Sequence, residues 1–88
     1  MDMQKSLLTF PCDFPIKVMG GKRDGFADAI VGIVLRHAPD LDVSQVEMRA
    51  SSGGKYLSLT CVINAVSMAQ LDNLYQELTA QEWVEVVL

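Results

Sequence analysis

The sequence predicts an α+β fold of the ferredoxin-like class, a split β-α-β sandwich whose four-stranded antiparallel sheet carries two helices on one face. Residues 55–66 alternate between apolar and mixed positions, which is the pattern of a long strand with one buried face. Residues 26–37 and 68–78 repeat apolar side chains every three or four positions, as amphipathic helices do. With two shorter strands the order is β-α-β-β-α-β, and short connections with right-handed crossovers favour this arrangement.

The chain of 88 residues suits one small domain, which we place at residues 10–88 behind an N-terminal arm of residues 1–9. Half of its residues are hydrophobic, so a core can form without a disulfide or a metal. Cys12 and Cys61 are far apart and follow no signal peptide, so we expect reduced thiols. The longest apolar runs, such as 29–35, are too short to cross a bilayer. We therefore expect a cytoplasmic protein with no membrane partner.

The net charge of −4 argues against nucleic acid as a partner, because phosphate binding usually depends on a basic patch. The only local cluster of positive charge is Lys22 with Arg23, with Lys17 nearby. His37 is the only histidine, so the sequence offers no set of metal-binding histidines. We expect neither a metal nor a cofactor.

The first strand and first helix follow from backbone chemistry. Pro15 lacks an amide hydrogen and is expected at the start of a strand over residues 16–20. Asp24 is expected to be the N-cap of the helix at residues 26–37, which Pro39 ends.

The second half of the chain begins with a strand at residues 44–51, whose inward side chains would be Val46, Met48 and Ala50. The turn at residues 51–54 joins this strand to the long one in a hairpin.

A capping box then starts the second helix, because Ser67 and Gln70 can each accept from a free backbone amide. The core-facing side chains of that helix would be Met68, Leu71, Leu74, Tyr75 and Leu78. Residues 83–88 form the last strand.

Three segments resemble the YbeD-like family of small bacterial proteins. They are residues 10–20 (Phe-Pro-Cys-Asp-Phe-Pro-Ile-Lys-Val-Met-Gly), 51–56 (Ser-Ser-Gly-Gly-Lys-Tyr) and 67–75 (Ser-Met-Ala-Gln-Leu-Asp-Asn-Leu-Tyr). The resemblance covers residues 8–88, nearly the whole chain. That family is functionally uncharacterised, and its fold resembles the ACT-type regulatory domain, which implies the same order of elements. The resemblance brings no catalytic residues.

The loop at residues 20–25 is the first candidate site, for a small-molecule effector. The selected residues are Gly20, Gly21, Lys22, Arg23 and Asp24. Glycines ahead of a helix can present backbone amides to an anion, and the two cationic side chains add charge. The ACT-type domains that the chain resembles bind small effectors near the corresponding loop. The alternative is a flexible turn with solvated charges, since one glycine-rich loop is a weak motif.

The outward face of the sheet is the second candidate site, for a protein partner or for self-association. The selected interface residues are Met19, Arg49, Tyr56, Val62 and Trp83. The other outward residues would be Lys17, Glu47, Thr60 and Val87. Helices on one side leave this face open, and Tyr, Trp, Met and Arg are enriched at interfaces. The alternative is an ordinary hydrated face.

These features favour a non-catalytic regulatory or protein-interaction module, and not an enzyme. The alternative is a small-metabolite sensor that binds an effector at the loop of residues 20–25. A remote alternative is an acylphosphatase-like hydrolase, which has the same fold and an arginine loop. Arg23 and Asn64 would serve that activity, but the motif that surrounds such residues is missing.

Overall fold

The computed structural model describes residues 9–88, so the arm predicted at residues 1–9 lies, except for Thr9, outside the described residues. In chain order the elements are β1 (Cys12–Gly21), α2 (Phe26–His37), the short 3-10 helix η1 (Val43–Gln45), β2 (Glu47–Ala50), β3 (Tyr56–Ala65), α3 (Met68–Thr79) and β4 (Val84–Val87). This is the predicted order. No helix within the described residues is long and apolar enough to cross a membrane.

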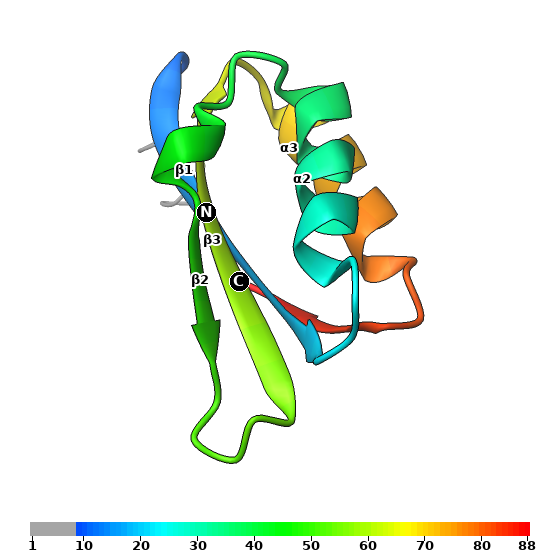
Figure 1. The fold of residues 1–88 in the computed structure, drawn as a ribbon. Coiled ribbons are helices and arrows are strands. Elements are labelled where there is room, and N and C mark those ends of the chain that lie inside the picture. Colours follow the sequence, from blue (N-terminus) through cyan, green and yellow to red (C-terminus); the bar gives the residue numbers. More distant parts are fainter. Residues whose placement is uncertain (1–8) are drawn as a thin grey trace.

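The four strands form one antiparallel sheet in the order β2-β3-β1-β4. β3 is a central strand, as its length suggested, and pairs with β1 from Cys12↔Ala65 to Gly21↔Tyr56. Both helices cover the same face of the sheet (Figure 1). The predicted ferredoxin-like fold is therefore confirmed.

β1 begins at Cys12, earlier than predicted, and Pro15 lies inside it. Lys17 donates to and accepts from Leu88, at 3.0 and 2.8 Å, so its amide points to the β4 side. Pro15 lies two residues earlier and its nitrogen points the same way. The β4 ladder reaches only from Lys17 to Gly20, so no neighbouring strand requires an N–H from Pro15.

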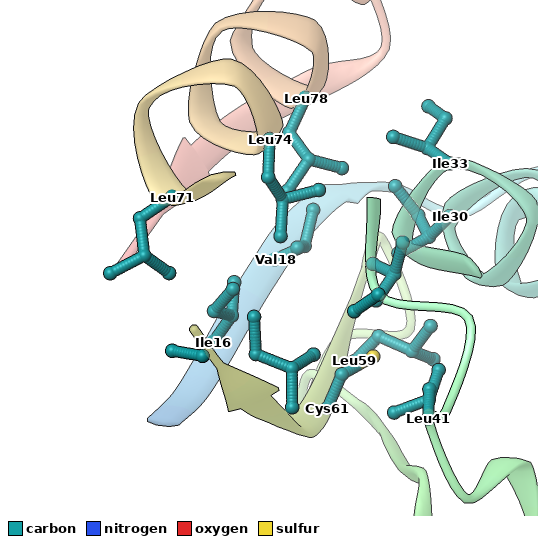
Figure 2. Packing of buried hydrophobic residues seen from close by; sticks show 14 of the residues in the cluster. Ile16, Val18, Ile30, Ile33, Leu41, Leu59, Cys61, Leu71, Leu74 and Leu78 are labelled. Atoms are coloured by element: carbon teal, nitrogen blue, oxygen red, sulfur yellow. The ribbon is translucent and has the colours of Figure 1, made fainter. Parts of the chain in front are cut away.

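The core lies between the sheet and the helices, and Figure 2 shows its side chains converging from both layers. The sheet contributes Ile16, Val18, Leu59, Cys61, Ile63 and Ala65, none of them more than 1% exposed. The helices contribute Phe26, Ile30, Ile33, Val34, Leu71, Leu74 and Leu78. Full burial of one large apolar side chain contributes about 1.5–3 kcal/mol, so these alternating and helical patterns are the main source of stability.

β2 is shorter than predicted, and its inward side chains are not buried. Met48 pairs with Leu59 and lies on the same side of the sheet, yet Met48 is 57% exposed while Leu59 is 1% exposed. The β2–β3 hairpin extends past the helix layer (Figure 1), which leaves this part of the edge strand uncovered. The predicted side of Met48 was correct, but its predicted place in the core was wrong.

The predicted capping box at the start of α3 is present. The Ser67 hydroxyl oxygen accepts from the Gln70 amide at 3.1 Å, and the Gln70 side-chain oxygen accepts from the Val66 amide at 2.7 Å. Gln70 also donates through Nε2 to the carbonyl of His37 at 2.9 Å, which ties the start of α3 to the end of α2. Met68 is 38% exposed, so its predicted place in the core was wrong.

The variant Ser67→Ala is expected to lower the free energy of unfolding by about 1 kcal/mol, because one amide in the first turn of α3 loses its acceptor. Urea unfolding followed by circular dichroism measures the change. The matched control is Ser52→Ala in the exposed hairpin turn, which should change stability by less than about 0.5 kcal/mol. Equal losses in the two variants would contradict a role for the cap.

Candidate functional site

A hollow of about 630 Å³ lies between the β1–α2 loop and the β2–β3 hairpin, on the helix side of the sheet. Its lining residues are Lys22, Arg23, Asp24, Gly25, Phe26, Ala27, Asp28, Met48, Ala50 and Leu57. Small-molecule sites commonly have volumes of about 300–1,000 Å³. The hollow forms where the hairpin extends beyond the helices (Figure 1), so the geometry that exposes Met48 also creates the site.

Backbone hydrogen bonds hold the loop beside the hairpin. Gly21 ends β1 and pairs with Tyr56 at the start of β3. One residue later, the N–H of Lys22 donates to the carbonyl of Lys55 at 2.8 Å. The β1–β3 ladder therefore continues one step into the loop and sets the point where the chain leaves the sheet. The loop side chains that follow are exposed at the rim of the hollow.

The N-terminus of α2 presents free amides to the hollow. Gly25 precedes the helix at φ 82°, in the left-handed region that glycine adopts without strain, and no side chain caps the helix. The prediction that Asp24 is the N-cap was therefore wrong. Among the described residues, the N–H groups of Ala27 and Asp28 have no acceptor. The positive end of the helix dipole thus lies at the hollow.

The hollow has an apolar floor and a charged rim. The hairpin supplies Met48, Ala50 and Leu57 to the floor, and α2 adds Phe26 and Ala27. The charged side chains of the rim are Lys22, Arg23, Asp24 and Asp28. Two cations and two carboxylates balance in number, so the free helix amides supply the remaining attraction for an anion.

Trp83 lies beside this loop on the helix side of the sheet, and its predicted place on the open face was wrong. Its ring meets Phe26 edge to face, with centroids 5.6 Å apart and an interplanar angle of 77°. The guanidinium carbon of Arg23 lies 6.0 Å from the centre of the Trp83 ring. A smaller hollow of about 160 Å³ opens among these three side chains. Arg23 lines both hollows and connects them.

Trp83 precedes β4 and lies outside its ladder, so strand alternation does not set its side. β4 pairs Val87 with the buried Val18, but it pairs Val84 with Gly20, so one extra residue lies between the two pairs. Side-chain parity counted along β4 fails across that residue. Val87 faces the core because it pairs with Val18, and Trp83 packs against the core from the turn before the strand, whereas the prediction had put both outside.

The structure brings together only some of the loop residues selected from the sequence. Lys22, Arg23 and Asp24 line the hollow, whereas Gly20 and Gly21 belong to β1 and do not. The floor residues from the hairpin were missed as site residues, because inward parity in a strand normally means burial. The length of the strands could have identified these residues, because two strands that extend past both helices must leave inward side chains uncovered.

The other four predicted interface residues do lie on the open face of the sheet. Met19, Arg49 and Tyr56 border a shallow hollow of about 170 Å³. Val62 lies further along β3 and is 46% exposed. Arg49 and Met19 both pair with Ser58, which places them on either side of β3 in the same row.

The remaining groups with chemical potential lie elsewhere. His37 Nε2 is 2.6 Å from Glu77 Oε1, and Arg36 pairs with the same carboxylate, so this cluster joins the two helices. Burial raises the pKa of the Cys61 thiol, which disfavours the nucleophilic thiolate. The part of the chain that the structure describes contains no group of three or more His, Cys, Asp or Glu side chains placed to hold a metal ion.

Arg23 and Asn64 are not brought together. Arg23 follows the end of β1 that pairs with Tyr56, whereas Asn64 pairs with Asp13 near the other end of the ladder. Eight residues of strand separate these rows, or about 26 Å. Asn64 instead donates to Asp40 at 3.3 Å. The geometry required for an acylphosphatase-like site is absent from these two residues.

Comparison with known proteins identifies close relatives of similar length. A family model described as "Protein of unknown function (DUF493)" matches residues 5–88. The UPF0250 protein of Nitrosomonas europaea is 48% identical over 85 residues, which cover 97% of this chain and 98% of the relative. The UPF0250 protein of Ralstonia nicotianae is 51% identical over 85 residues, covering 97% and 88%.

Two solved structures share the fold at low sequence identity. The crystal structure of the ACT domain from GTP pyrophosphokinase of Chlorobium tepidum aligns with a TM-score of 0.66 and 19% identity, covering 88% of this chain and 97% of that one. The solution structure of protein HP0495 from H. pylori aligns with a TM-score of 0.72 and 13% identity, covering 99% and 91%. These similarities establish an ACT-like fold.

Proposed function

The chain belongs to the YbeD-like family, DUF493, and with that membership as the premise we propose that it is a regulatory module that binds a small anionic metabolite and catalyses no reaction. The ACT-like fold supports a regulatory type of role. The observation that carries the proposal is the hollow between the uncapped start of α2 and the β2–β3 hairpin. It combines free amides, cationic side chains and an apolar floor within one small-molecule volume.

The residues around the hollow favour binding over catalysis. Its lining includes no His, Cys, Ser, Thr or Tyr, so it lacks hydroxyl and thiol nucleophiles and the commonest general base. The two carboxylates, Asp24 and Asp28, are exposed, and water competes with any bound group for them. Such a site can recognise charge and shape.

The proposed ligand has a carboxylate or phosphate at one end and a short apolar group at the other. The anionic end accepts from the amides of Ala27 and Asp28 and pairs with Lys22. The apolar group covers Met48 and Leu57, whose exposure to water then falls. A ligand with only the anionic group or only the apolar group would contact half of the site.

Arg23 connects the proposed ligand site to Trp83 and β4. It stacks on Trp83, which enters β4, and it also reaches the hollow. An anion that draws Arg23 from the ring towards the hollow changes the surroundings of the only tryptophan. Binding should therefore alter tryptophan fluorescence as well as stability.

The first test is a thermal-shift panel of amino acids, 2-oxo acids, nucleotides and inorganic phosphate. A compound that binds the native state must raise the melting temperature in a saturable way. For any such compound, the double variant Lys22→Ala/Arg23→Ala should raise the dissociation constant at least about tenfold, since hydrogen bonds to charged groups contribute about 1.5–3 kcal/mol. Arg23→Ala alone should also abolish the fluorescence change.

Two further variants separate the site from general effects. Arg36→Ala removes a positive charge from the far end of α2 and should leave the dissociation constant within about twofold, because surface charges a helix length away are screened. Ala50→Phe fills the floor of the hollow from an exposed position and should remove binding while the protein stays folded. A ligand that binds the Ala50→Phe and double variants as tightly as the parent would contradict the proposed site.

A further inference from the structure

The open face of the sheet has an ordered arrangement that the metabolite site does not use. Neither helix covers this face (Figure 1), and the outward side chains of three strands form regular rows across it. One row consists of Glu47 on β2, Thr60 on β3 and Lys17 on β1. The next row consists of Arg49, Ser58 and Met19 in the same order of strands.

Apolar and aromatic groups extend the face along β3 beyond these rows. Tyr56 at one end is 47% exposed and Val62 towards the other is 46% exposed. Gly21, which pairs with Tyr56, has open space where a side chain would be. The face thus has two partly apolar ends, a row of opposite charges between them, and room beside the tyrosine ring.

The two charges of the first row are placed where they cannot neutralise each other. Lys17 and Glu47 lie two strands apart, at a backbone separation of about 10 Å. The ion pairs within residues 9–88 all use Glu77 on α3, so neither side chain has an intramolecular partner there. The charges lie at equal distances on either side of β3, with opposite sign.

We propose that this face binds a second copy of the chain, about a twofold axis that runs along β3. Such an axis exchanges the two sides of β3 and keeps every residue in its row. Glu47 therefore meets Lys17 of the second copy, and Lys17 meets its Glu47, which gives two ion pairs per dimer. Thr60 and Val62 each meet their own counterparts on the axis. Self-complementarity of this kind is what an isologous interface requires.

The charges select this axis over its neighbour. An axis midway between β1 and β3 would cover β4 as well, but it would place Glu47 against Leu88 and Arg49 against Val86 of the second copy. Both charges would then be covered by apolar groups without a partner, at a desolvation cost. The axis along β3 pairs Glu47 with a cation and leaves only Arg49 opposite an apolar side chain, Met19 of the second copy, so it buries fewer charges without a partner.

The expected interface is small. β1 and β3 have ten residues each and β2 has four, so at about 3.3 Å per residue and about 4.8 Å per strand the face covers roughly 380 Å² per copy. The total of roughly 760 Å² is below the usual size of a specific interface, so the dimer should be weak and dissociate at micromolar or higher concentrations. Sedimentation equilibrium between about 5 and about 300 µM covers that regime.

The decisive experiment reverses the charges singly and together. Lys17→Glu places a carboxylate against each Glu47 of the opposite copy, and Glu47→Lys creates the matching clash of cations, so each should raise the dimer dissociation constant at least about tenfold. The double variant Lys17→Glu/Glu47→Lys restores both pairs with exchanged signs and should return the constant to within about threefold of the parent. The dimer should also weaken with added salt.

Two controls complete the experiment. Asp72→Lys changes the charge on the outer side of α3 and should leave the dimer unchanged, whereas Val62→Asp puts like charges on the axis and should give a monomer with native circular dichroism. A parent protein that stays monomeric at all concentrations would overturn the proposal. So would single reversals without effect, or a double variant that fails to recover, because either result means that these two charges do not meet.

Discussion

Replacing Gly20 with alanine is expected to lower the free energy of unfolding by about 3 kcal/mol or more. A Cβ at this buried position would lie 2.7 Å from Cε1 of Phe26 and closer still to the carbonyl oxygen of Trp83. The carbonyl belongs to the backbone that enters β4, so relief requires a shift of the strand and not a new rotamer. A loss of this size is a large fraction of the stability of a small domain.

The neighbouring glycine provides the matched control. A Cβ at Gly21 would meet nothing within 4 Å, and its backbone is outside the left-handed region. Gly21→Ala should therefore change stability by no more than about 0.5 kcal/mol, in the stabilising direction, because alanine has less freedom in the unfolded chain. Urea unfolding of the two variants side by side measures the difference. Equal effects at both positions would show that the close approach of Trp83 to Gly20 is not present in solution.

These two glycines show which features of the fold the sequence could predict and which it could not. Two adjacent glycines ahead of a helix predicted a flexible loop, and the helix that follows was placed correctly. The reason for Gly20 is a contact with Trp83, more than sixty residues away, and no local pattern carries that information. Within residues 20–25, only Gly25 has the left-handed backbone that a loop glycine suggests.

Hydrophobic periodicity predicted buried faces correctly wherever another layer covers one face of a helix or strand along its length. β3 and the core faces of both helices were predicted from spacing alone, since every inward position meets another layer. It failed at Met48, where the inward side lies beyond the helices, at Met68, the exposed first residue of α3, and at Trp83, which precedes β4 and its ladder. The failures at Met48 and Trp83 concern the same end of the sheet, and that end contains the candidate site.

The positions of Met48 and Trp83, which depart from the expected pattern at this end of the sheet, therefore point to a functional site. A hairpin that stops level with the helices would bury Met48 and leave no floor for a ligand. Trp83, in the turn before β4, packs on the helix side and supplies the stacking partner of Arg23. Departures from local rules are expected at functional sites, and here two of them meet around one loop.

The variant Phe26→Ala tests whether the core and the hollow depend on the same side chain. Phe26 is 1% exposed, lies in the first turn of α2, packs edge to face on Trp83, and forms part of the floor. Its removal should lower the free energy of unfolding by about 4 kcal/mol, through lost burial and an unfilled cavity. It should also shift the emission of native Trp83 to longer wavelength, because water reaches the ring.

Leu74→Ala is the control for Phe26→Ala, since Leu74 is fully buried on α3 and is not among the residues that line the hollow. It should cost about 3 kcal/mol yet leave the emission of the native state unchanged. If Phe26→Ala does not fold, Phe26→Leu keeps most of the volume and should cost about 1 kcal/mol while still shifting the emission. An unshifted spectrum in the phenylalanine variants would mean that Trp83 takes its position without Phe26, and the link between core packing and the Arg23 stack would fail.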